Sequence, residues 1–158
     1  RAHPWNFASA RAILTSEPAE RVNPKGQAVN GAAYSPSLGR WVAVGAADGT
    51  IPYIIHSTDG ITWTQVATAA ITTSRNVALN SVCWSASLSL FVAVGNSDGT
   101  DAYILTSPTG LVWTERTPTV AKLFALNKVV WASGLALLVA VGVADEVLER
   151  ETDILTLR

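Results

Sequence analysis

The chain has 158 residues and a formal net charge of −1; 49% of its residues are apolar and 15% are charged. This balance excludes an intrinsically disordered chain, and it gives no general attraction to nucleic acid or to an anionic membrane. The longest apolar stretch, residues 135–143, is about half as long as a membrane-spanning helix, so no membrane contact is predicted. The length is sufficient for one domain with a substantial hydrophobic core.

The first 28 residues do not follow the pattern of the rest. They lack the continuous apolar core of a secretory signal, although Ile13–Ser16 repeats part of a later strand phrase. We predict an N-terminal arm with a degenerate partial repeat over residues 1–28. Because the sequence begins at Arg1 and contains no methionine, we also expect a processed product, an excised fragment or part of a longer chain.

Three near-copies of one phrase follow this arm. Each copy contains an asparagine, then an aromatic residue, and ends in Val-Ala-Val-Gly, and the closing glycines are Gly45, Gly95 and Gly142. The period is therefore 50 and then 47 residues. A period near 50 residues with strand-like composition is typical of β-propeller blades.

Each copy divides into four short strands separated by turns. In the second copy these strands are predicted at Asn80–Ser85, Leu90–Val94, Ala102–Thr106 and Leu111–Thr114. The first copy matches it, with Tyr53–His56 and Ile61–Thr64 as its third and fourth strands, and the third copy ends on a third strand, Ile154–Leu157. We therefore predict an all-β fold, a propeller-like array of about three four-stranded blades.

The array is predicted to be an incomplete ring. The repeats run over residues 29–78 and 79–125, and a partial repeat runs over residues 126–158. Propellers close with about four to eight blades, so either further sequence or identical chains must complete the circle. A dimer with about six blades is the simplest closed solution.

An aromatic residue stands seven positions before the start of the second strand in every copy. The pairs are Tyr34 with Trp41, Trp84 with Phe91, and Trp131 with Leu138. Constant spacing predicts packing layers shared between neighbouring blades, with Trp84 and Trp131 as structural core residues.

The turn before the fourth strand, Ser57–Trp63, reads Ser-Thr-Asp-Gly-Ile-Thr-Trp. It resembles the Asp-box hairpin of sialidase-like propeller proteins, Ser-x-Asp-x-Gly-x-Thr-Trp, with one residue fewer between Asp59 and Gly60. The resemblance implies a structural turn in which Asp59 accepts backbone hydrogen bonds while Trp63 packs between sheets. The sister copy lacks the aspartate but retains Gly110 and Trp113. A direct ligand or metal role for Asp59 is the alternative.

The loops between the second and third strands offer carboxylates and hydroxyls on one rim. These candidate ligand-binding residues are Asp48, Thr50, Asp98, Thr100 and Asp101. A sugar or a cation could use them, but we favour the backbone requirement of an Asp-Gly turn, which explains them more simply.

No catalytic residue, metal or cofactor is predicted. Sialidases similar in fold use clustered arginines and a tyrosine nucleophile, whereas here the arginines fall at unlike repeat positions and the tyrosines (Tyr34, Tyr53 and Tyr103) fall at repeat core positions. His3 and His56 are too few and too far apart for a metal site. Cys83 lies in an apolar phrase and is predicted to be a small buried side chain.

The N-terminal phrase His-Pro-Trp-Asn-Phe-Ala, followed by Arg11-Ala12, is similar to a phrase in tail-tube or head–tail adaptor proteins of short-tailed phages. It makes His3, Trp5 and Phe7 candidate partner contacts; the alternative is that Trp5 and Phe7 attach the arm to a blade edge. The blade phrases also look like those of phage tail and virion proteins.

The leading hypothesis is a non-enzymatic virion protein, tail or capsid-associated. Its propeller-like platform serves assembly or host-surface attachment, with other virion proteins, identical subunits or a host-surface glycan as partners. The alternatives are a lectin-like propeller that binds carbohydrate and a remnant of a sialidase-like hydrolase.

Overall fold

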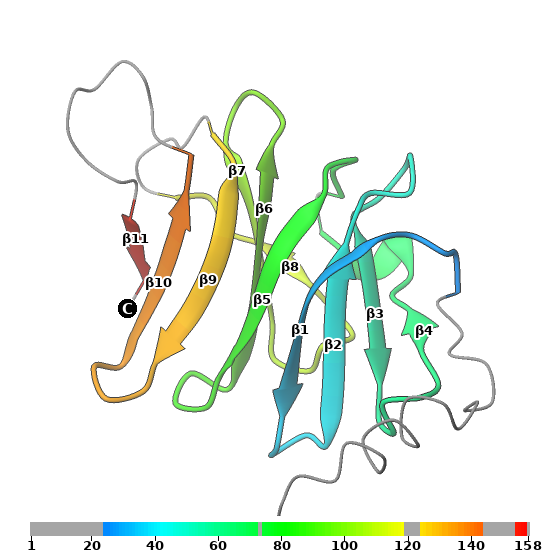
Figure 1. Cartoon of the computed structure of the whole chain (residues 1–158), viewed down its shortest axis with the longest axis horizontal. Coiled ribbons are helices and arrows are strands. Elements are labelled where there is room, and N and C mark those ends of the chain that lie inside the picture. Colours follow the sequence, from blue (N-terminus) through cyan, green and yellow to red (C-terminus); the bar gives the residue numbers. More distant parts are fainter. Residues whose placement is uncertain (1–23, 73, 119–123, 144–153, 158) are drawn as a thin grey trace, which may run out of the picture.

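The computed structural model describes residues 24–72, 74–118, 124–143 and 154–157. These residues form three antiparallel β-sheets and one short 3-10 helix, and none of them lies in an α-helix. The all-β prediction is confirmed, and none of the three sheets closes on itself. The sheets lie side by side with the second in the middle (Figure 1). No helix in the described part of the chain has the length and apolarity needed to cross a bilayer.

Each sheet is built from one copy of the repeat, with its strands in chain order. Sheet 1 contains β1 (Val29–Ser35), β2 (Arg40–Gly45), β3 (Tyr53–Ser57) and β4 (Thr64–Gln65). Sheet 2 contains β5 (Leu79–Ser85), β6 (Leu90–Ser97), β7 (Ala102–Ser107) and β8 (Thr114–Glu115). Sheet 3 contains β9 (Leu126–Ala132), β10 (Leu137–Gly142) and β11 (Ile154–Leu157). The 3-10 helix, Thr68–Ala70, connects the first two sheets.

The fourth strands are shorter and begin later than the sequence predicts. In the first copy the expected strand was Ile61–Thr64, but β4 starts only at Thr64. The backbone N–H groups of Ile61 and Thr62 donate to the Asp59 carboxylate instead, so they are not available to β3. The turn thus extends into the predicted strand.

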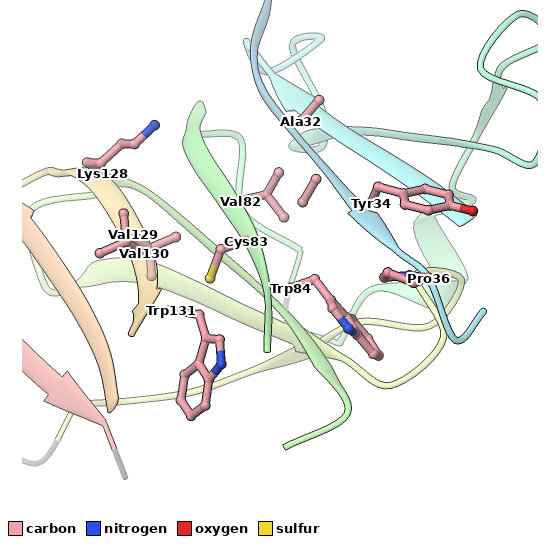
Figure 2. Close-up of a pocket in the computed structure, with 11 residues that line it drawn as sticks. Ala32, Tyr34, Pro36, Val82, Cys83, Trp84, Lys128, Val129, Val130 and Trp131 are labelled. Carbon is pink, nitrogen blue, oxygen red and sulfur yellow. The ribbon is translucent and has the colours of Figure 1, made fainter. Parts of the chain in front are cut away.

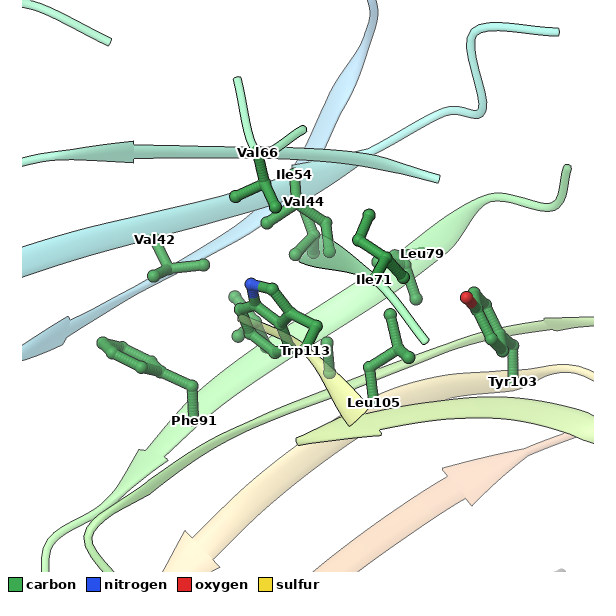
Figure 3. Close-up of a cluster of buried hydrophobic side chains, with 12 residues drawn as sticks. Val42, Val44, Ile54, Val66, Ile71, Leu79, Phe91, Tyr103, Leu105 and Trp113 are labelled. Atoms are coloured by element: carbon green, nitrogen blue, oxygen red, sulfur yellow. The ribbon is translucent and has the colours of Figure 1, made fainter. Parts of the chain in front are cut away.

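Sheets 1 and 2 bury their largest shared core between them. Sheet 1 contributes aliphatic side chains, including Val42, Val44 and Ile54, all fully buried. Sheet 2 contributes a bulkier, mostly aromatic face made of Phe91, Ala93, Tyr103, Leu105 and Trp113. Trp113 lies between the two faces, directed at the valines of β2 (Figure 3).

Sheets 2 and 3 repeat this arrangement one step along the chain. Because side chains alternate across a strand, the opposite face of sheet 2 carries Val92, Val94 and Ile104, the register equivalents of the sheet 1 residues. This face packs against Leu126, Val129, Leu138 and Ala140 of sheet 3. Sheets 1 and 2 therefore present the same aliphatic positions to the next sheet, and sheet 3 meets sheet 2 with an aliphatic face against which Trp131 packs.

A repeated asparagine joins the first strands of successive sheets. The Asn30 side-chain amide donates to the Leu79 carbonyl at 2.9 Å, and the Asn80 amide donates to the Leu126 carbonyl, also at 2.9 Å. Both asparagines lie at register irregularities, where the strand locally loses regular pairing. The repeated asparagine of the sequence is thus a link between sheets.

The face of sheet 1 that points away from sheet 2 differs from its equivalent in sheet 2. Tyr34 and Trp41 pair across strands with ring centroids 4.9 Å apart, but each is about two-fifths exposed, at 41% and 39%. The prediction that Tyr34 is a core residue is therefore wrong, since no described sheet lies against that side. In sheet 2 the equivalent Phe91 is fully buried.

The two turn tryptophans should differ in their effect on stability. Trp113 is fully buried between two sheets, whereas Trp63 is half-buried against Ala43, Tyr53 and Ile55 of its own sheet. We expect Trp113→Ala to lower the free energy of unfolding by about 3–5 kcal/mol, and the matched variant Trp63→Ala to lower it by roughly 1–2 kcal/mol. Urea denaturation followed by circular dichroism measures both values. Equal losses would contradict the assignment of Trp113 to the interface.

Candidate functional site

Asp48, the rim aspartate of the first copy, stabilises the loop in which it lies. Asp48 Oδ1 accepts hydrogen bonds from the backbone N–H groups of Thr50 and Ile51 at 2.9 and 3.0 Å, and Oδ2 pairs with Lys25 Nζ at 2.5 Å. The Asp48 side chain is only 4% exposed. The Lys25 ammonium, together with these N–H groups, holds the pKa of Asp48 well below its usual range. Asp48 therefore has little capacity left for an external ligand.

The second copy repeats this construction with an arginine. Arg75 Nη1 lies 3.1 Å from Asp98 Oδ2, Nη2 pairs with Glu115, and the guanidinium stands 5.3 Å from the centre of the Tyr103 ring. The backbone N–H of Thr100 donates to Asp98 Oδ1, and this bond is the main reason that the pKa of Asp98 is lowered. Asp101 contributes its backbone carbonyl, which accepts from Arg75 Nη1 at 3.2 Å.

The basic partners of these loops were not identified as site residues from the sequence. Lys25 and Arg75 each stand four positions before the first strand of their sheet, and each donates its backbone N–H to a tyrosine hydroxyl, of Tyr53 and Tyr103 respectively, at 3.4 Å. The only hint in the sequence was that a basic residue stands four positions before the first strand in both copies. Lys122 has the same spacing before β9 but lies outside the described residues. The rim loops are therefore clamps within each sheet and do not converge on one another.

The turn around Asp59 also uses its carboxylate for hydrogen bonds within the turn. Asp59 Oδ1 accepts from the Ser57 hydroxyl and from the backbone N–H groups of Ile61 and Thr62 at 2.7–2.8 Å, and these backbone bonds hold the pKa of Asp59 well below its usual range. In the sister turn the Thr109 hydroxyl takes one of these N–H groups, that of Leu111. Gly110 adopts φ +78°, and a Cβ there would stand 2.7 Å from a methyl carbon of Val42. Both turns therefore serve the packing of the hairpin.

A hollow of about 340 Å³ adjoins the Asp59 turn and is lined in part by Arg40, His56 and Thr64. Burial, and secondarily the Arg40 charge, lowers the pKa of His56, so its imidazole is neutral at pH 7. Arg40 donates through Nη1 to the Thr109 carbonyl at 2.6 Å, which ties it to the sister turn. Arg40 thus holds the two neighbouring turns together.

A groove crosses the first strands of all three sheets. β1, β5 and β9 are each the edge strand of their sheet, and β5 contacts both of the others. The groove has a volume of about 560 Å³. It is lined by Ala32, Ala33, Tyr34, Pro36, Val82, Cys83, Trp84, Lys128, Val129, Val130 and Trp131 (Figure 2).

One aromatic side chain from each sheet lines this groove. They are Tyr34, Trp84 and Trp131, the three residues that the constant spacing had assigned to packing layers. Tyr34 is exposed, and Trp84 and Trp131 are half-buried, so each ring keeps an accessible part. Aromatic rings that are partly accessible supply apolar contact area together with a polar N–H or O–H group. The groove can therefore stack against a flat or amphipathic ligand.

The charge in the groove is concentrated at one end. Lys128, on β9, is the single charged residue among the described lining residues. Burial raises the pKa of the Cys83 thiol to about 11 despite the nearby Lys128, so the thiol stays protonated at neutral pH and is no nucleophile. The groove thus combines aromatic surface with a single cation and can accept a ligand that carries a negative charge.

The remaining predicted contact residues, His3, Trp5 and Phe7, lie outside the described residues. Within the described ranges, no three His, Cys, Asp or Glu side chains stand close enough together to hold a metal ion. Neither the scan against protein-family models nor the search of curated proteins finds a match for this chain.

Asp48 and Asp59, whose carboxylates accept hydrogen bonds within their own loops, should make the folded protein less stable in acid. Their pKa values are lower in the folded protein than the unfolded value of about 3.9, so their contribution is present above about pH 5 and is lost as the pH falls toward the folded-state values. We expect the double variant Asp48→Asn, Asp59→Asn to flatten the fall in unfolding free energy between about pH 5 and pH 2.5. Above pH 5 the variant and wild-type curves should run parallel. Urea titrations across this range test the expectation, and identical acid slopes would refute it.

Proposed function

We propose that this chain is a non-enzymatic structural and interaction protein of a phage particle, in which the three sheets are consecutive blades of a propeller-like array. The repetition of one interface carries the proposal. The same register positions and the same asparagine bond join sheet 1 to sheet 2 and sheet 2 to sheet 3. A repeated interface of this kind builds a rigid platform whose curvature is set by a constant step per repeat.

The arrangement of basic and acidic side chains supports a role other than catalysis. Arg40, Arg75 and Arg116 bond to three different partners, namely a turn carbonyl, the Asp98 loop and the Thr106 hydroxyl. Tyr53 and Tyr103 are fully buried in the sheets. A sialidase-like site would need several arginines and a tyrosine converging on one accessible hollow.

The phage assignment rests on the phrases of the sequence. The N-terminal His-Pro-Trp-Asn-Phe-Ala and the blade phrases with Val-Ala-Val-Gly both resemble virion proteins. A platform of packed sheets with an exposed aromatic groove suits assembly with other virion proteins or attachment to a host surface.

Mass spectrometry of purified particles tests this location. We expect peptides of the chain to co-purify with intact particles of the encoding phage, at a ratio to the major tail proteins that stays constant through a density gradient. A chain found only in the lysate supernatant would contradict the proposal.

Carbohydrate binding is the second candidate, and the groove favours it more than the rim loops do. The rim carboxylates of Asp48 and Asp98 are engaged in their own loops, whereas the rings of Tyr34, Trp84 and Trp131 remain partly accessible. Partly exposed aromatic rings in a row can stack against sugar faces.

A glycan array distinguishes the groove from the rims. If carbohydrate binds in the groove, Tyr34→Ala and Lys128→Ala should each reduce binding at least about tenfold, a typical loss for a central contact. Asp98→Asn should leave it unchanged, as should the surface control Ile61→Ala. Binding that is lost in Asp98→Asn and retained in both groove variants would place the sugar at the rims.

A further inference from the structure

The outer face of sheet 3 resembles the face of sheet 1 that sheet 2 buries. Val130, Val139 and Val141 occupy the register positions that Ala33, Val42 and Val44 hold in sheet 1. Val42 and Val44 are completely buried by sheet 2, whereas Val130 is 46% and Val141 is 41% exposed. The third sheet therefore presents an aliphatic face for which the described residues supply no neighbouring sheet.

The asparagine that links successive sheets also lacks a described partner at this end. Asn127 is the third copy of Asn30 and Asn80, both of which donate to a carbonyl of the next sheet. Asn127 is exposed, and no described residue accepts a hydrogen bond from its side chain. It stands where Asn30 and Asn80 reach the first strand of the next sheet, so it can bond a further first strand beside β9.

The opposite end of the array carries part of the matching surface, next to β1. Val29, Tyr34 and Trp41 of sheet 1 are the equivalents of Leu79, Trp84 and Phe91, through which sheet 2 contacts sheet 1. Val29 is 46%, Tyr34 41% and Trp41 39% exposed. The same chain thus exposes the sheet 3 half of the interface and, of the sheet 1 half, the part formed by Val29, Tyr34 and Trp41, while Ala43, Tyr53 and Ile55 on the same face are already buried.

We infer that a second copy of this chain docks its β1–β2 surface onto the β9–β10 face of the first. Asn127 then donates to the Val29 carbonyl of the second copy, and Val130 and Val141 cover Tyr34 and Trp41. The contact is heterologous, because two different surfaces meet, and it closes into a ring or continues as a chain of subunits. The inference rests on the blade-array part of the proposed function and is independent of the location in a phage particle.

One residue of the third sheet departs from the internal pattern. Lys128 holds the position of Gly31 and Ser81, where the backbones of successive first strands approach closely: a Cβ on Gly31 would stand 3.3 Å from the Ser81 Cα. In the contact between copies the lysine stem must lie along the face with its ammonium in the groove. Lys128→Ser removes this obstacle and should strengthen association several-fold.

Light scattering with two single-face variants tests the contact. Val141→Glu disables the sheet 3 face, and Trp41→Glu disables the sheet 1 face, because each places a carboxylate in an apolar contact. We expect the wild-type chain to form dimers or larger assemblies, and each variant alone to be a folded monomer. An equimolar mixture of the two variants should form a two-chain species, since one intact surface of each kind remains.

Controls separate this contact from folding and from other modes of association. Leu135→Glu changes a turn residue that is 73% exposed and should leave assembly intact. Circular dichroism and thermal unfolding confirm that each variant is folded, and Val130→Glu with Tyr34→Glu provides a second pair. A monomeric wild-type chain would overturn the inference. So would a Trp41→Glu variant that assembles normally, because that result indicates an isologous contact between two sheet 3 faces. Neither outcome bears on whether the chain occurs in phage particles.

Discussion

The fold depends on the burial of the aliphatic face of one sheet against the facing side of the next sheet. Trp113 is the centre of this interaction in sheet 2, where it lies fully buried among the valines of β2 and the side chains of its own sheet. The hydrophobic effect supplies the driving force, and Asn30 and Asn80 each fix the position of the next sheet. The turns and the rim loops support this packing of one sheet on the next.

The repeated step explains why the molecule has two unlike ends and why its candidate function lies at surfaces. The aspartates, Arg75, Arg116 and two of the tyrosines are engaged within single sheets, and Arg40 ties sheet 1 to a turn of sheet 2, so they contribute to stability. The accessible features are the aromatic groove across β1, β5 and β9, the valine face of sheet 3 and the aromatic pair Tyr34–Trp41. All three features arise where the repeat places a side chain that no described neighbouring sheet covers completely.

Much of the fold was predictable, because the period and the strand alternation report directly on burial. Strand positions such as Leu90–Val94 within β6 and Ile154–Leu157 agree with the structure. The late start of β4 and the exposure of Tyr34 were not predictable, because they depend on where hydrogen bonds of Asp59 go and on what lies beside sheet 1. The groove was missed because its aromatic residues looked like core positions, and whether an aromatic ring is fully covered depends on tertiary neighbours.

A double-mutant cycle between Val44 and Trp113 tests the central claim most directly. Val44→Ala and Trp113→Phe are mild enough for the chain to remain folded, and urea denaturation gives the free energy of unfolding for each single variant and for the pair. If the two faces stabilise each other, the coupling energy should be at least about 0.5–1 kcal/mol. Losses that add to within about 0.3 kcal/mol would show that the two residues act independently, and this would contradict the account.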